Sequence, residues 1–111
     1  MLGLGSKLFM EFFGTFLLCF TVAVAVPAAG AAAPLAIGAT LMCAVYAGGH
    51  ISGANYNPAV TLAIWIRGKL SFVEFITYML VQLIAGCIAG NVRDGRLTDT
   101  ERKGPSLSAA A

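Results

Sequence analysis

A long stretch of this chain carries almost no charge. Between Leu8 and Ile66 the only Asp, Glu, Lys or Arg side chain is Glu11. Over all 111 residues the charged fraction is 11%, whereas a typical soluble domain has about 25%. Because small soluble domains leave much of their surface in water, a chain of this size cannot hide so many apolar side chains. The sequence therefore excludes an ordinary soluble enzyme.

Three apolar segments, residues 8–26, 32–50 and 72–90, are each 19 residues long. A helix of that length measures roughly 28 Å, close to the ~30 Å hydrocarbon core of a bilayer. For the first segment the alternative is a signal peptide cleaved after Ala25, but signal peptides have shorter apolar cores and Glu11 is unusual in one. We predict an all-α membrane protein with three transmembrane helices and a short segment, residues 1–7, before the first.

The segment 51–66 is polar and contains glycine in its first half, and is apolar in its second. Asn57 followed by Pro58 is a typical helix start, an N-cap and then proline at the first helical position. A helix from Pro58 to Ile66 is roughly 13 Å long, about half the membrane, and Arg67 then returns the chain to water. We therefore expect a re-entrant loop and half-helix. The alternative is an ordinary loop followed by a short helix at the membrane surface.

A re-entrant loop leaves backbone carbonyl groups at membrane depth. Such groups are tolerated only where they are buried in protein or line a watery cavity, so residues 52–56 are a candidate pore wall. The half-helix N-terminus carries about half a positive charge, and the Asn57 amide adds an N–H donor. This combination favours the oxygen of a neutral dipolar solute and repels cations.

At these residues the sequence resembles a known family. The run 52–61, Ser-Gly-Ala-Asn-Tyr-Asn-Pro-Ala-Val-Thr, is similar to the first signature loop of the aquaporins, or major intrinsic proteins. Glu11, Gly14 and Thr15 resemble the first-helix pattern of that family, and Gln82 with Gly86 resembles its third helix. The resemblance covers residues 7–90 and implies one aquaporin-like repeat, half of the inverted-repeat fold.

The resemblance also implies roles for single positions. Asn57, Pro58 and Ala59 form the channel motif, in which the asparagine donates hydrogen bonds to passing water or polyol hydroxyls. Glu11 resembles a buried glutamate that accepts hydrogen bonds from the loop backbone, and His50 resembles a structural hydrogen-bonding residue of the loop. The implied pore-lining positions are Leu18, Ile37, Gly53, Ala54, Asn55 and Val60.

Two of these positions depart from the family pattern, and the role of Glu11 has an alternative. Asn55 stands where many members have a second histidine, and the aliphatic Ile37 stands where they often have an aromatic residue. The choice between water and small neutral solutes such as glycerol therefore stays open. A carboxylate inside a span is expected to have a hydrogen-bond partner. Because Glu11 is only three residues from Leu8, the alternative is a carboxylate at the membrane interface.

The second repeat of the family is missing from these 111 residues. One repeat supplies one asparagine and half of a pore wall, so we expect a half-channel that cannot enclose a pore by itself. Its composition changes abruptly at residue 91, and residues 91–111 are predicted to be a disordered tail unlike the family. The alternative function is a non-conducting truncated product or a regulatory partner of full-length channels.

Basic residues give a weak orientation signal. With a cytoplasmic N-terminus, Lys7, Arg67 and Lys69 lie inside and the four basic residues of the tail lie outside, which is nearly balanced. Mixed orientation would permit an antiparallel pair of copies. The expected partners are therefore the lipid bilayer, water or small neutral solutes, and a second copy or a full-length channel. Whether the membrane is a plasma membrane or an internal vacuolar one is open.

Other functional classes have little support. The net charge of +2 and the absence of a basic stripe argue against nucleic acid. No pair of the three cysteines has the spacing of zinc ligands, so we expect neither a metal nor a cofactor. With one histidine and no paired carboxylates there is no nucleophile and base to propose, and an enzyme is not expected.

Overall fold

The computed structural model describes residues 3–103, and the side chains of residues 3–95. Within that range the chain is helical and contains no strand. The elements are α1 (Leu4–Ala29), the 3-10 turn η1 (Gly30–Ala32), α2 (Ala33–Ser52), α3 (Pro58–Ile66) and α4 (Phe72–Lys103). Two stretches, Leu4–Ser52 and Phe72–Gly95, are long and apolar enough to cross a membrane.

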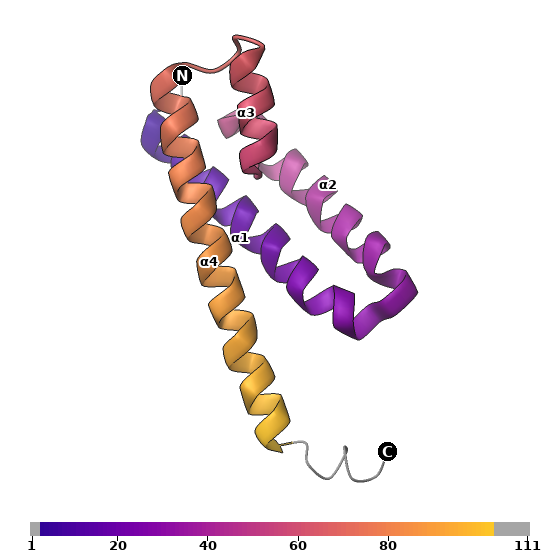
Figure 1. The fold of residues 1–111 in the computed structure, drawn as a ribbon. Coiled ribbons are helices and arrows are strands. Elements are labelled where there is room, and N and C mark those ends of the chain that lie inside the picture. Colours follow the sequence, from indigo (N-terminus) through magenta and orange to yellow (C-terminus); the bar gives the residue numbers. More distant parts are fainter. Residues whose placement is uncertain (1–2, 104–111) are drawn as a thin grey trace.

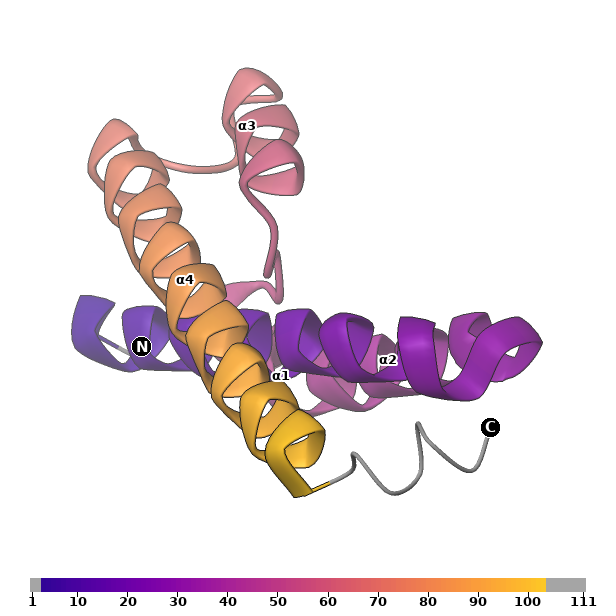
Figure 2. The same cartoon turned by 60° about the horizontal axis from the view of Figure 1, so that its bottom comes forward.

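The first of these stretches is bent back on itself. Gly30 takes a positive φ of 55°, a conformation that costs glycine little, and η1 reverses the chain there. Pro34 then occupies the first turn of α2, where its missing N–H removes no helical hydrogen bond. Figure 1 and Figure 2 show α1 and α2 as a hairpin with η1 at its tip. The 49-residue apolar stretch is therefore two packed helices.

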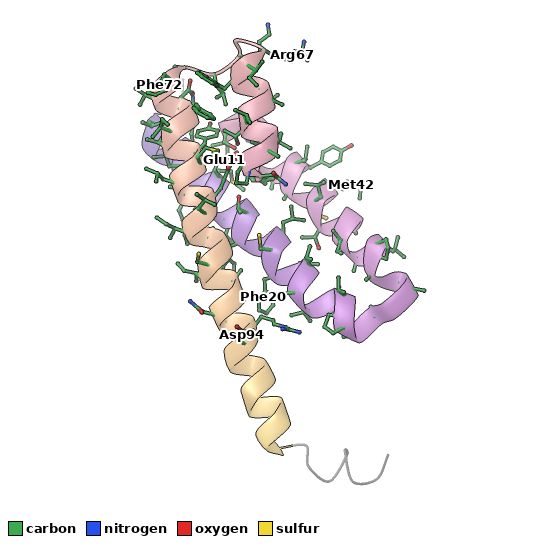
Figure 3. All side chains as sticks on the ribbon, viewed as in Figure 1. Glu11, Phe20, Met42, Arg67, Phe72 and Asp94 are labelled. Atoms are coloured by element: carbon green, nitrogen blue, oxygen red, sulfur yellow. The ribbon has the colours of Figure 1, made fainter. Side chains whose placement is uncertain are left out.

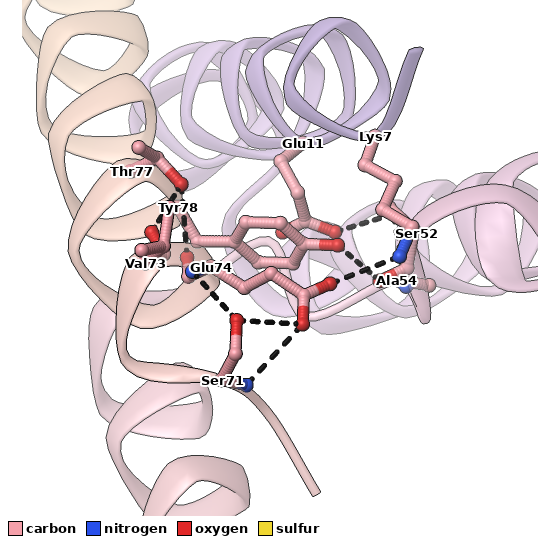
Figure 4. Close-up of polar contacts among 9 residues, drawn as sticks. All are labelled: Lys7, Glu11, Ser52, Ala54, Ser71, Val73, Glu74, Thr77 and Tyr78. Carbon is pink, nitrogen blue, oxygen red and sulfur yellow. Dashed lines mark hydrogen bonds and ion pairs between the residues drawn. The ribbon is translucent and has the colours of Figure 1, made fainter. Parts of the chain in front are cut away.

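Helix α4 crosses α1, as Figure 2 shows, and α3 packs beside the first turns of α4. The ring of Trp65 in α3 stacks on that of Phe75 in α4, with centroids 4.4 Å apart. Ser71 and Glu74 form a capping box at the start of α4: Ser71 Oγ accepts from Glu74 N at 3.2 Å, and Glu74 Oε1 accepts from Ser71 N at 3.2 Å. Lys7 of α1 pairs with Glu74 at 2.9 Å (Figure 4), so the starts of α1 and α4 are held together.

The helix bounds agree with the sequence in part. Helix α3 covers Pro58–Ile66, the residues predicted for the half-helix, and the three predicted spans fall on α1, α2 and α4. The predicted N-terminal segment 1–7 differs, because α1 already begins at Leu4.

The predicted disordered tail differs as well. Helix α4 continues through residues 91–103, while residues 104–111 lie outside the described range. The physical reason is that adding a residue to an existing helix gains a hydrogen bond without the cost of nucleation. Arg, Leu, Glu and Lys in this stretch are also good helix formers.

The outer faces of the helices carry large apolar side chains. Leu35 is 77% exposed, Tyr46 82%, Ile66 71% and Phe72 63%. Figure 3 shows Phe72 on the outside of the bundle. Apolar exposure over so wide a surface indicates contact with an apolar phase. The fold is that of an all-α membrane protein.

Candidate functional site

The loop between α2 and α3 has an unusual backbone. Gly53 ends α2 with a φ of 90°, and Ala54 and Tyr56 also take positive φ values, 55° and 59°. For residues other than glycine this left-handed conformation costs about 1–2 kcal/mol each. Asn57 then returns to an extended conformation and caps α3. Such a loop persists only if its surroundings hold it in place.

Glu11 holds the loop. Its side chain is fully buried, and four donors converge on the two carboxylate oxygens. Oε2 accepts from Ser52 Oγ at 2.5 Å and from Asn55 N at 3.1 Å. Oε1 accepts from Tyr56 N at 2.8 Å and from Gln82 Nε2 at 2.9 Å. Figure 3 shows Glu11 directed into the space between the helices. The four donors match the four acceptor positions of a carboxylate, so α1, the loop and α4 are joined at one residue.

A second set of hydrogen bonds fixes α3 and the end of α2 to α4. Gln82 Nε2 donates to Thr61 Oγ1 of α3 at 2.8 Å, and Asn55 Nδ2 donates to the same oxygen at 3.4 Å. Tyr78 donates its hydroxyl to the carbonyl of Ser52 at 2.7 Å. These side chains are all buried, and in a low-dielectric interior satisfied networks of this kind specify a single arrangement.

Tyr56 fills the space between α1 and α2. It is 1% exposed, and its hydroxyl donates to the carbonyl of Ala44 at 2.7 Å. The ring fits only because two glycines face it: a Cβ at Gly14 would overlap the ring, and one at Gly48 would overlap the hydroxyl. The residue just before Asn57 is therefore clamped between two helices.

Asn57 presents its amide at the start of α3. Its Oδ1 accepts from Ala59 N at 2.7 Å, which satisfies one of the free N–H groups of the helix. Within residues 3–103, Asn57 Nδ2 donates to nothing, and no donor reaches the carbonyl oxygens of Gly53, Ala54 and Asn55. The loop thus offers one amide donor and three backbone acceptors.

The predicted pore-lining residues lie in several places. Leu18, Asn57 and Pro58 line one groove of about 570 Å³ between α1 and α4. Ile37 is half-buried on α2 and does not line that groove. Ala59 and Val60 are exposed on α3, outside the same groove. The structure therefore brings Asn57 together with Leu18 and leaves Ile37 and Val60 apart from them.

His50 lies differently from the prediction. It is exposed in the last turn of α2, and its side chain makes no hydrogen bond within the described part of the chain. His50 lies within α2, which continues to Ser52 before the chain turns. The support predicted for His50 comes instead from Ser52 and Tyr78.

Three residues of the site were not singled out from the sequence: Tyr56, Tyr78 and Thr61. Tyrosine and threonine are ordinary residues in apolar helices, and only the fold brings them together. The sequence feature that could have pointed to them is the pair of glycines, Gly14 and Gly48, in apolar helices. Glycine there lets a neighbouring group come close to the helix backbone.

Comparisons with known proteins identify a family and several relatives. The model of the major intrinsic protein family matches residues 4–103, which includes most of the tail predicted to be unlike the family. An Aquaporin Z of Photorhabdus laumondii subsp. laumondii is 41% identical over 95 residues, covering 78% of this chain and 41% of that protein. An Aquaporin Z of Flavobacterium johnsoniae is 43% identical over 75 residues, covering 60% of this chain and 95% of that sequence.

A third relative, an Aquaporin Z of Brucella melitensis biotype 1, is 36% identical over 96 residues, covering 78% of this chain and 42% of that protein. The chain thus spans about two fifths of the length of the first and third of these relatives.

Proposed function

This chain belongs to the major intrinsic protein family, and on that premise we propose that it forms half of a channel wall for water or small neutral solutes such as glycerol. The observation that carries the proposal is the strained loop tied to Glu11. It leaves Asn57 Nδ2 and the carbonyl oxygens of residues 53–55 without hydrogen-bond partners among the residues that the structure describes. A neutral solute that accepts from the amide and donates to the carbonyls exchanges its hydrogen bonds with water for equivalent ones.

The proposed topology is three crossings by α1, α2 and α4, with α3 as a re-entrant half-helix. Figure 1 supports it, because the N-terminus and the α3–α4 turn lie at one end of the molecule and η1 lies at the other. We expect cysteines placed at Ser6 and Lys69 to react with a membrane-impermeant reagent from one side, and a cysteine at Ala31 from the other. Labelling of Ser6 and Lys69 from opposite sides would contradict the re-entrant assignment.

The proposed partner is a second unit that closes the pore, either another copy of this chain or a longer channel. The groove between α1 and α4 is open along one side, and the helix faces around it are apolar. Half a wall by itself leaves polar loop groups facing lipid, which is unfavourable. The chain is therefore proposed to conduct only in a paired state.

Water flow out of proteoliposomes, followed by stopped-flow light scattering, tests the proposal. The chain is reconstituted alone and together with the Photorhabdus relative. Asn57→Asp is the matched variant, because aspartate retains the helix cap while it replaces the N–H donor with an oxygen and adds a negative charge. We expect faster shrinkage than in matched liposomes that lack this chain in at least one preparation, and loss of that gain in the variant. No gain in either preparation, with helical protein verified in the bilayer, would overturn the proposal.

A further inference from the structure

Tyr56, the residue directly before Asn57, is held at both of its ends. Its backbone N–H donates to Glu11 Oε1 of α1 at 2.8 Å, and its hydroxyl donates to the carbonyl of Ala44 in α2 at 2.7 Å. Because Tyr56 is 1% exposed, neither lipid nor water stands ready to replace a lost bond. One side chain therefore ties the loop to two helices, at the position next to Asn57.

The two bonds fix a backbone torsion that is unfavourable by itself. Tyr56 takes a φ of 59°, in the left-handed region that residues other than glycine rarely adopt. This torsion is the rotation about the N–Cα bond. Because Glu11 holds the N–H of Tyr56, a return to negative φ would swing the Tyr56 ring and Asn57 together. The ring cannot swing without breaking its bond to Ala44, so that bond also restrains Asn57.

The space around the ring leaves it no second position nearby. A Cβ at Gly14 would overlap the ring, and a Cβ at Gly48 would overlap the hydroxyl. The same Cβ at Gly48 would lie 2.6 Å from Met10 Cγ, so the Met10 side chain and the hydroxyl lie beside each other over Gly48. Met10 is itself buried and offers no strong acceptor. The hydroxyl therefore depends on the Ala44 carbonyl.

The bond that Asn57 makes itself is local. Its Oδ1 accepts from Ala59 N at 2.7 Å, which fixes the amide relative to α3 only. Tyr56 supplies the restraint relative to α1 and α2. We propose that Tyr56 is a positioning residue whose hydroxyl sets the direction in which Asn57 presents its amide donor. The proposal rests on the proposed function for the role of that donor, but the state of the amide is measured without transport.

NMR of the full chain labelled with ¹⁵N-asparagine, in detergent micelles, tests the proposal. The label reports three side-chain amides, and Asn57→Asp identifies the signals of Asn57. Tyr56→Phe keeps the ring and removes the hydroxyl. We expect one set of Asn57 signals in the unchanged chain. In Tyr56→Phe a second set should appear, with the population of the minor conformer raised about tenfold by the loss of one buried hydrogen bond.

Tyr78→Phe is the matched control. Tyr78 is also 1% exposed, and its hydroxyl donates to the carbonyl of Ser52 at 2.7 Å. Each variant loses one buried hydrogen bond, so both should lower the unfolding midpoint by a similar amount. Only Tyr56→Phe should change the Asn57 signals. Unchanged Asn57 signals in folded Tyr56→Phe, or equal changes in the two variants, would show that Tyr56 has a structural role alone and would overturn the proposal.

A second measurement needs no variant. In the unchanged chain the hydroxyl proton of Tyr56 should exchange with water at least about a hundredfold more slowly than that of free tyrosine, because its bond to Ala44 is buried. Rapid exchange would also overturn the proposal. Water flow separates the two proposals: absence of flow in every preparation removes the channel function and leaves the NMR result for Tyr56 intact. Flow in the unchanged chain, with Asn57 signals that ignore Tyr56→Phe, removes the positioning role alone.

Discussion

The two ends of the α1–α2 hairpin are stabilised in different ways. At the loop end, Glu11, Ser52 and Gln82 are buried, and each is hydrogen-bonded to another element. At the η1 end the only buried residues are Ala25 and Ala33, within the described part of the chain. Buried hydrogen bonds therefore fix the structure of the loop end, whereas the structure of the η1 end depends on the apolar phase around it.

Loss of Glu11 should have the largest effect. Glu11→Ala leaves three buried donors and the Ser52 hydroxyl without their acceptor. Unsatisfied buried groups cost about 1–3 kcal/mol each, so we expect the unfolding free energy to fall by at least about 3 kcal/mol. Thermal unfolding in detergent micelles, followed by circular dichroism, measures the change.

The matched control is Glu74→Ala, which removes a carboxylate with a side chain 23% exposed. Surface ion pairs contribute about 0–1 kcal/mol, so this variant should differ little from the wild type. Equal losses in the two variants would mean that the loop end is not specified by the buried carboxylate.

A second test fills the space opposite Tyr56. In Gly48→Ala the new Cβ overlaps the Tyr56 hydroxyl, and overpacking of this kind costs about 1–3 kcal/mol. Gly38→Ala lies on the same helix with nothing within 4 Å of the added Cβ. It should stabilise the helix by up to about 1 kcal/mol, because alanine is the better helix former. The two midpoints should therefore move in opposite directions, and a loss in both would indicate that α2 tolerates no added methyl group anywhere.

The sequence predicts the helical parts of this region better than its contacts. Asn57 and Pro58 are a local signal, since a cap and a first-turn proline act within one turn, and α3 begins where they predict. The sequence also predicts that the Glu11 carboxylate has a hydrogen-bond partner, because a carboxylate inside a membrane span needs one. Its four particular donors lie 41 to 71 residues away in the chain.

What could not be predicted depends on the tertiary arrangement. The clamped ring of Tyr56 follows from which helix faces meet, and neither composition nor spacing encodes that. The role expected for His50 also depended on this arrangement, because its side chain is exposed in the last turn of α2 and makes no hydrogen bond within the described part of the chain.

A third test removes one hydroxyl from the clamp. Tyr56→Phe retains the ring and loses the bond to Ala44, so we expect a loss of about 0.5–1.5 kcal/mol. Tyr46→Phe is the matched control on α2, because Tyr46 is 82% exposed and its change should stay within about 0.5 kcal/mol. If the two variants unfold at the same midpoint, the ring alone positions the loop and the hydroxyl contributes nothing.

The smallest effect is expected for a polar contact that lies at the loop end but near its surface. Lys7 and Glu74 pair at 2.9 Å, with side chains 30% and 23% exposed. Lys7→Met retains the aliphatic stem, so its expected cost is below about 1 kcal/mol. This cost should vanish in 1 M salt, where the screening length is about 3 Å, whereas the cost of Glu11→Ala should not change. Unfolding midpoints at low and high salt therefore show whether buried hydrogen bonds or partly exposed ion pairs stabilise the loop end. Lys7→Met could instead lower the unfolding free energy as much as Tyr56→Phe, with no dependence on salt. That result would mean that the surface pair belongs to the same hydrogen-bond network as Glu11.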